Sequence, residues 1–239
     1  MTMRCQIVAE LATSHGGDIA VAEDMIRAAA DAGADLVKLQ TYSLERLNPR
    51  DPQAAWLRQS HLDEGRHAHL LGVAQRAGIE LFSTPFDADS LAMLRRLGLK
   101  RFKVASSESG NDWWMPQNGE HWIVSYPWGN TLGCPDHLTS TDFLQLTAIP
   151  LYPTPLECVD RARLLDGWSD HCEGIAACLW AIAQGAQMIE VHFWHGESRH
   201  LSFDKSTEQV RQIRRFAEDC ETMKSGVSQR FRDRWRVSA

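Results

Sequence analysis

Residues 169–193 read SDHCEGIAACLWAIAQGAQMIEVHF and show the order strand, helix, strand. A helical pattern at 172–186 separates two strand-like segments, one at 169–171 and one at 187–194. This order places the two strands parallel to each other. Neighbouring strands lie about 4.8 Å apart, so His171 and His192 at matching strand ends could share one divalent metal. The alternative is two unrelated histidines, one in a loop and one in the core.

The first half of the chain alternates in the same way. Strand patterns at 7–10, 36–41, 80–84 and 101–106 are separated by helical patterns at 18–32, 61–77 and 87–97. Gly33, Gly78 and Gly98 follow these helices, as expected where a helix stops. Repeated strand-then-helix units predict a parallel sheet.

The second half adds strand patterns at 121–126 and 146–152 and helical patterns at 156–165 and 206–224. Eight strand candidates in 239 residues favour an α/β fold of the (β/α)₈ barrel type over an open doubly wound sheet. Segments 107–120 and 128–145 lack a helical period, so we expect weakened or missing helices after strands four and five. No G-x-G-x-x-G or Walker loop occurs, which argues against Rossmann and P-loop proteins.

Composition limits the class of partner and the compartment. The net charge of −6 gives no broad basic surface for nucleic acid. Six cysteines without a C-x-x-C pair fit reduced thiols. We see no secretion signal and no apolar run of the roughly 18 residues that a membrane span needs, so we expect a cytoplasmic protein. We also expect one domain over 1–239, ending in a basic tail at 226–239.

Polar side chains recur where the strand patterns end, which in a (β/α)₈ barrel is the active-site face. Lys38 and Lys103 lie inside apolar runs, where an ammonium group needs an anionic partner or a shifted pKa. An internal salt bridge to Glu10 or Glu190 would serve equally well, because buried charges are usually paired.

Seven short motifs occur in one order along the chain. They are AELATSHGGD (9–18), VKLQT (37–41), STPFD (83–87), FKVAS (102–106), YPTP (152–155), WSDH (168–171) and EVHF (190–193). Together they resemble the barrel domain of the sialic acid synthase family, over about residues 4–210. The resemblance implies an enzyme that condenses phosphoenolpyruvate with the open-chain aldehyde of an N-acetylated amino sugar, giving a nonulosonic acid and phosphate.

The resemblance also implies a role for each matching residue. His171 and His192 would bind a divalent metal. Mn²⁺ is the ion that the resemblance favours, with Mg²⁺ or Co²⁺ as alternatives, and the metal would polarise the aldehyde. Glu10 would position or deprotonate the attacking water. Among the substrate contacts, Lys38 and Thr84 would hold the carboxylate of phosphoenolpyruvate. The phosphate would contact Lys103, Ser106, Ser125 and Ser169, and the acceptor would contact Gln40, Tyr152 and Asp204.

The chain departs from the family pattern at several points. We expect no counterpart of the family's C-terminal antifreeze-like domain, and Ser14, Pro127 and Pro150 replace residues of the family motifs. Two other functions therefore stay open: a non-catalytic or partner-dependent relative that binds phosphoenolpyruvate, and an aldolase or lyase that forms a Schiff base on Lys38 or Lys103. We further expect a homo-oligomer, or a complex, in which a partner covers the barrel flank that lacks helices. Core packing of the tryptophans at 113, 114, 122 and 128 within one subunit is the alternative to such a partner.

Overall fold

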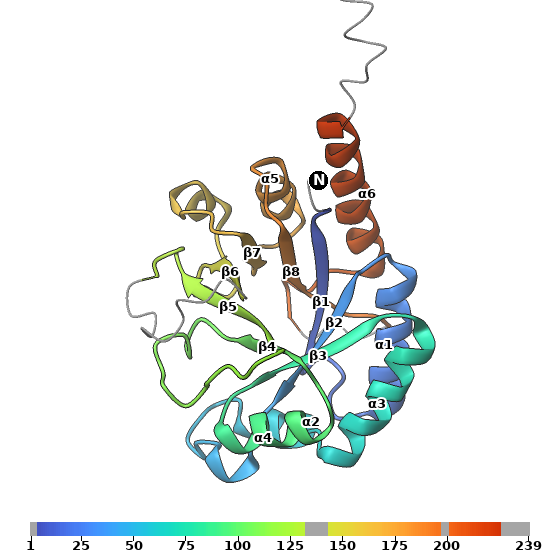
Figure 1. Ribbon diagram of the computed structural model, residues 1–239, viewed down its shortest axis with the longest axis vertical. Coiled ribbons are helices and arrows are strands. Elements are labelled where there is room, and N and C mark those ends of the chain that lie inside the picture. Colours follow the sequence, from blue (N-terminus) through green and yellow to red (C-terminus); the bar gives the residue numbers. More distant parts are fainter. Residues whose placement is uncertain (1–3, 132–142, 197–200, 226–239) are drawn as a thin grey trace, which may run out of the picture.

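Eight parallel strands close into a barrel in sequence order (Figure 1). The computed structural model describes residues 4–131, 143–196 and 201–225. The strands are β1 (Gln6–Ala12), β2 (Leu36–Thr41), β3 (Glu80–Pro85), β4 (Arg101–Val104), β5 (His121–Pro127), β6 (Phe143–Ala148), β7 (Gly167–Asp170) and β8 (Met188–His192). Pairing of β8 with β1 closes the barrel and puts Glu10 in register with His192, while Glu10 is also in register with Lys38 of β2. The predicted (β/α)₈ barrel is confirmed.

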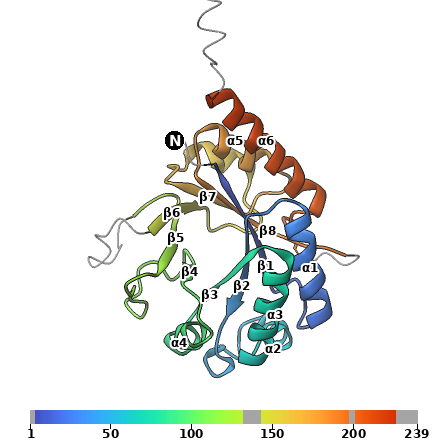
Figure 2. The ribbon, with the colours of Figure 1, turned by 45° about the vertical axis from the view of Figure 1, so that its right-hand side comes forward.

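Helices cover much of the outside of the barrel. They are α1 (Ile19–Asp31), η1 (Leu44–Arg46), α2 (Ala54–Ser60), α3 (Glu64–Ala77), α4 (Ala88–Arg96), η2 (Leu156–Arg161), α5 (Ala176–Ala183) and α6 (Thr207–Ser225). Figures 1 and 2 show α1 beside α3 on one flank and α5 beside α6 on another. The carboxylates of Asp18, Asp63 and Asp87 cap the N-termini of α1, α3 and α4, which satisfies backbone N–H groups there.

Several sequence expectations were wrong in detail. The helix expected at 172–186 is the shorter α5 (Ala176–Ala183), and the strand expected at 101–106 ends at Val104. The sixth strand runs over Phe143–Ala148 instead of 146–152, because Pro150 has no N–H with which to continue the ladder. The helix expected at 156–165 is a short 3₁₀ helix, η2, which ends where Ala162 turns extended. The segment expected as one helix at 61–77 begins only at Glu64, and the preceding α2 was missed because seven residues hold too little helical period.

The flank at β4 and β5 is covered by a loop instead of a helix. Residues 105–120 contain no helix, as predicted, whereas residues 132–142 after β5 and the predicted tail at 226–239 lie outside the described residues. Trp114 is fully buried and stacks on Trp122 of β5 with ring centroids 5.4 Å apart. Trp128 is 38% exposed. Trp114 and Trp122 therefore pack inside one subunit, and the oligomer stays a prediction.

Two further observations concern the described part of the chain as a whole. No helix within residues 4–131, 143–196 and 201–225 is long and apolar enough to cross a membrane. In these same ranges Cys5, Cys158, Cys172, Cys178 and Cys220 are free thiols, and Cys134 lies outside them.

Candidate active site

A cavity of about 480 Å³ opens at the carboxyl ends of the strands. All predicted site residues except Asp204 line it: Glu10, Lys38, Gln40, Thr84, Lys103, Ser106, Ser125, Tyr152, Ser169, His171 and His192. The remaining lining residues are Phe86, Ala105, Ser107, Pro127, Ala148, Pro150 and Glu190. Barrel closure therefore brings together side chains that come from all eight strands or the residues that follow them.

The two lysines share one carboxylate at the floor of this cavity. Glu190 Oε2 lies 3.4 Å from Lys38 Nζ, and Glu190 Oε1 lies 3.6 Å from Lys103 Nζ. Ser169 donates a hydrogen bond of 2.8 Å to Glu190 Oε1. The internal salt bridge that the sequence left as an alternative is therefore present. Sequence reasoning did not count Glu190 as a site residue, although it stands two residues before His192.

Each lysine also reaches a hydroxyl group on a neighbouring strand. Lys38 Nζ donates to Thr84 Oγ1 at 2.8 Å, and Lys103 Nζ donates to Ser125 Oγ at 2.7 Å. Burial lowers the pKa of Lys38 to about 7 and also lowers the pKa of Lys103. Burial opposes the ionisation of Glu190, but Lys103 and Lys38 outweigh it and bring its pKa to about 2. The cavity floor thus holds an ionised carboxylate between two desolvated amines.

Glu10 is held at the end of β1 by a β-bulge. The register with β2 shifts between Glu10 and Ala12, and Ala12 has a positive φ of 45°. This bend lets the backbone N–H of Ala12 donate to Glu10 Oε1 at 3.1 Å, while Glu10 Oε2 forms an ion pair with Lys38. Bulges commonly re-aim a side chain next to an active site, and this one presents the carboxylate to the cavity.

His171 and His192 lie side by side on the β7–β8 side of the cavity. Their ring centroids are 5.4 Å apart, with an edge-to-face angle of 63°. Burial lowers the pKa of His171 to about 4 and lowers the pKa of His192 well below its usual value. Both imidazoles are therefore neutral at pH 7, which is the protonation state that binds metals.

The surroundings of the two rings fit a divalent cation. Nδ1 of His171 lies 3.3 Å from the carbonyl oxygen of Ile149, which can only accept a hydrogen bond. Nδ1 of His192 faces Asp204 Oδ1 at 3.7 Å. Metal-binding histidines usually direct one ring nitrogen to a carbonyl or carboxylate in this way, leaving the other for the ion. The described residues hold no group of three or more His, Cys, Asp or Glu side chains that could bind a metal, so the protein would supply two ligands here.

Asp204 lies behind the cavity instead of lining it. Its side chain is completely buried, and it accepts a hydrogen bond of 3.2 Å from Ser14 Oγ and one of 3.0 Å from the backbone N–H of Leu201. The acceptor contact expected for Asp204 stays a prediction. In contrast, Tyr152 is 58% exposed and places its ring 4.3 Å from that of His171.

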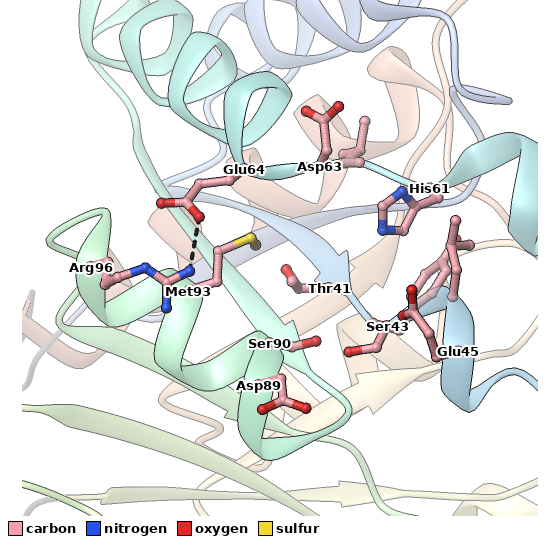
Figure 3. Close-up of a pocket in the computed structure, with 13 residues that line it drawn as sticks. Thr41, Ser43, Glu45, His61, Asp63, Glu64, Asp89, Ser90, Met93 and Arg96 are labelled. Carbon is pink, nitrogen blue, oxygen red and sulfur yellow. Dashed lines mark hydrogen bonds and ion pairs between the residues drawn. The ribbon is translucent and has the colours of Figure 1, made fainter.

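A second cavity, of about 300 Å³, lies outside the barrel mouth between the end of β2, α3 and α4 (Figure 3). None of the predicted site residues lines it. Glu64 and Arg96 form an ion pair of 2.8 Å there, and Asp63 is engaged as the N-cap of α3. The predicted site residues that line a cavity are therefore found in the barrel cavity and not in this one.

Comparison with known proteins identifies the family. The model of the NeuB family matches residues 25–117 and 136–229. The chain belongs to the NeuB family. A relative from Campylobacter jejuni, N,N'-diacetyllegionaminic acid synthase, is 31% identical over 223 residues, covering 78% of this chain and 66% of the relative. The chain thus spans about two thirds of that relative's length.

Two further likenesses extend over more of the chain. The N,N'-diacetyllegionaminic acid synthase of Legionella pneumophila is 28% identical over 271 residues, covering 93% of this chain and 74% of the relative. A solved N-acetylneuraminic acid synthetase from Leptospira borgpetersenii has a TM-score of 0.80 at 22% identity and covers 98% of this chain and 93% of its own. The structural likeness shows the barrel fold, and the family match confirms the resemblance found in the seven motifs.

Proposed function

We propose that this chain condenses phosphoenolpyruvate with the open-chain aldehyde of an N-acylated amino sugar, giving a nonulosonic acid and inorganic phosphate. The observation that carries the proposal is the convergence of two lysines and two neutral histidines on one cavity of about 480 Å³. Membership of the NeuB family and relatives that are named as nonulosonic acid synthases support it.

Phosphoenolpyruvate would bind at the floor of the cavity. A small, multiply charged anion needs cations in a desolvated site, and Lys38 and Lys103 are both almost completely buried. We assign the substrate carboxylate to Lys38 and Thr84. We assign the phosphate to Lys103 with the hydroxyl groups of the serines at 106, 125 and 169. The existing Lys–Thr and Lys–Ser hydrogen bonds hold both ammonium groups in place before the substrate arrives.

The acceptor aldehyde would lie above this floor, toward His171 and His192. These two residues would hold a divalent metal, for which Mn²⁺ is our preferred ion. The metal would supply Lewis-acid polarisation of the aldehyde oxygen. Gln40 and Tyr152, which line the same cavity, would contact the hydroxyl groups of the sugar. The enol carbon without the phosphate would form the new C–C bond to the aldehyde carbon, whose oxygen then takes up a proton. Water would add to the phosphate-bearing carbon and give its proton to Glu10, and inorganic phosphate would leave from that carbon as the ketone forms.

The test is phosphate release from phosphoenolpyruvate with N-acetylmannosamine or a diacetamido sugar, with and without Mn²⁺. We expect release that depends on both the sugar and the metal, and Lys103→Met should abolish it. Lys100→Met is the matched control, because Lys100 is an exposed lysine before the other end of the same strand. Tight binding of phosphoenolpyruvate without phosphate release for any sugar would instead support the non-catalytic relative.

One observation favours a second candidate function. An amine whose pKa burial lowers to about 7, as for Lys38, is partly neutral at pH 7 and can act as a nucleophile. The second candidate is therefore an aldolase or lyase that forms a Schiff base on Lys38. Borohydride in the presence of a keto or aldehyde substrate would trap a covalent adduct on this enzyme. An unchanged protein mass would exclude it.

A further inference from the structure

Lys205 is completely buried although it carries a charge. Its ammonium lies 2.7 Å from Asp170 Oδ2 in an ion pair. It also donates hydrogen bonds to the carbonyl oxygens of Cys172, at 2.5 Å, and Phe203, at 2.9 Å. Asp170 in turn accepts a bond of 2.9 Å from the indole of Trp168. Because a buried ion pair adds little net stability compared with apolar packing, this pair calls for a role beyond stability.

The ion pair joins the two strands that carry the histidines. Asp170 is the last residue of β7 and directly precedes His171. The backbone of Lys205 continues the pairing at the end of β8: its N–H donates to the carbonyl of His192 at 2.7 Å, and its carbonyl accepts from Trp194 at 3.1 Å. Lys205 therefore holds the ends of β7 and β8 together beside the two imidazoles.

The segment anchored by Lys205 also surrounds the imidazoles. The ring of Phe203 lies edge-on, 5.0 Å from that of His192 and 5.9 Å from that of His171. Asp204 Oδ1 faces His192 Nδ1 at 3.7 Å, which is longer than a hydrogen bond, and the negative charge of a carboxylate at this distance favours the tautomer that carries the proton on Nδ1. The side chain of Lys205 donates a hydrogen bond to the carbonyl of Phe203. A substitution of Lys205 would therefore shift both Phe203 and Asp204 relative to His192.

We propose that Lys205 is a positioning residue that keeps His192 in the Nδ1–H tautomer and holds His171 and His192 in one mutual orientation, so that Nε2 of each ring is the metal-binding atom. The inference rests on the proposed function only where it concerns the metal. The tautomers and the ring geometry are properties of the metal-free chain, and they can be measured without any substrate.

The test uses Lys205→Met, which keeps an unbranched side chain one atom shorter and removes the charge. In the wild type, ¹⁵N long-range correlation spectra should show both imidazoles as Nδ1–H tautomers, and in Lys205→Met the signal of His192 should change to a mixture. Affinity for Mn²⁺, read from the free-ion EPR signal, should fall at least tenfold. If the single variant does not fold, Asp170→Asn/Lys205→Met removes both charges and should restore folding without restoring the single tautomer.

Arg214→Met is the matched control. Arg214 forms a comparable ion pair with Asp35 and donates to the carbonyls of Gly33 and Cys5, at the other end of the barrel. It should lower stability without changing tautomers or Mn²⁺ affinity. Unchanged tautomers in Lys205→Met, or an equal change in Arg214→Met, would overturn the proposal. A wild type that shows the tautomers but binds no Mn²⁺ would leave the positioning role supported and count against the metal in the proposed function.

Discussion

Glu190→Gln tests whether Lys38 and Lys103 form an anion-binding site at the cavity floor. In the free protein the carboxylate of Glu190 would occupy this site in place of a substrate anion. Glu190 lies 3.4 Å from the ammonium of Lys38 and 3.6 Å from that of Lys103. At an effective dielectric constant of about 20, each of these pairs corresponds to about 5 kcal/mol of Coulomb attraction. Glutamine keeps the shape and the hydrogen bond from Ser169 but leaves two buried ammonium groups with fewer partners.

We expect the variant to lose about 3–5 kcal/mol of unfolding free energy, as for a buried pair from which one partner is removed. In a chain of this size that loss lowers Tm by roughly 6–20 °C. Urea unfolding followed by tryptophan fluorescence measures the loss. Phosphate or phosphoenolpyruvate should stabilise the variant more than the wild type, with affinity about tenfold higher, because the competing carboxylate is gone.

Glu120→Gln is the control for this prediction. Glu120 is also buried and accepts two hydrogen bonds from Arg95, of 2.7 and 2.9 Å, but on the β4–β5 flank outside the cavity. It should lose stability without gaining any response to phosphate. If Glu190→Gln is as stable as the wild type, or if phosphate stabilises both forms equally, Lys38 and Lys103 do not form the anion site described above.

Three further predictions follow from buried groups and close contacts. Because burial lowers the pKa of Lys38 to about 7, binding of phosphoenolpyruvate at pH 8 should take up a proton, and calorimetric heats that do not depend on the buffer would contradict this. The pKa values of His15 and His171 are lowered to about 4, so the unfolded chain binds more protons below pH 6.5. Stability should then fall as pH drops from 6.5 to 4, by up to about 1.4 kcal/mol per pH unit for each histidine; urea midpoints that stay constant would refute it. Gly167→Ala should prevent folding, since its Cβ would lie 2.3 Å from a β8 carbonyl oxygen, whereas Gly65→Ala in α3, with 3.5 Å to its nearest neighbour, should fold normally by circular dichroism.

Much of the barrel could be predicted because its strands are short apolar runs between helical periods. The strand at 36–41 was predicted with its bounds, and glycines with positive φ follow α1, α3 and α4 at positions 33, 78 and 98, as expected. The errors fall where local pattern is weak. Pro150 lay inside an apolar run that looked like a strand, and α2 was too short to show a period. The burial of Trp114 depended on a neighbour, Trp122, that no local pattern indicates.

The amino-acid sequence by itself determined the alternation of strands and helices and the presence of charged or polar groups at strand ends. It also required that Lys38 and Lys103 have either an anionic partner or a shifted pKa, because an unpaired ammonium group in an apolar run is too costly to bury. Only the tertiary structure decided that Glu190 stands between both lysines and that Lys205 joins β7 to β8. The physical reason is that the barrel closes. The periodicity of the sequence shows on which face of its own strand a side chain lies, whereas the pairing of β8 with β1 brings together residues about 180 positions apart.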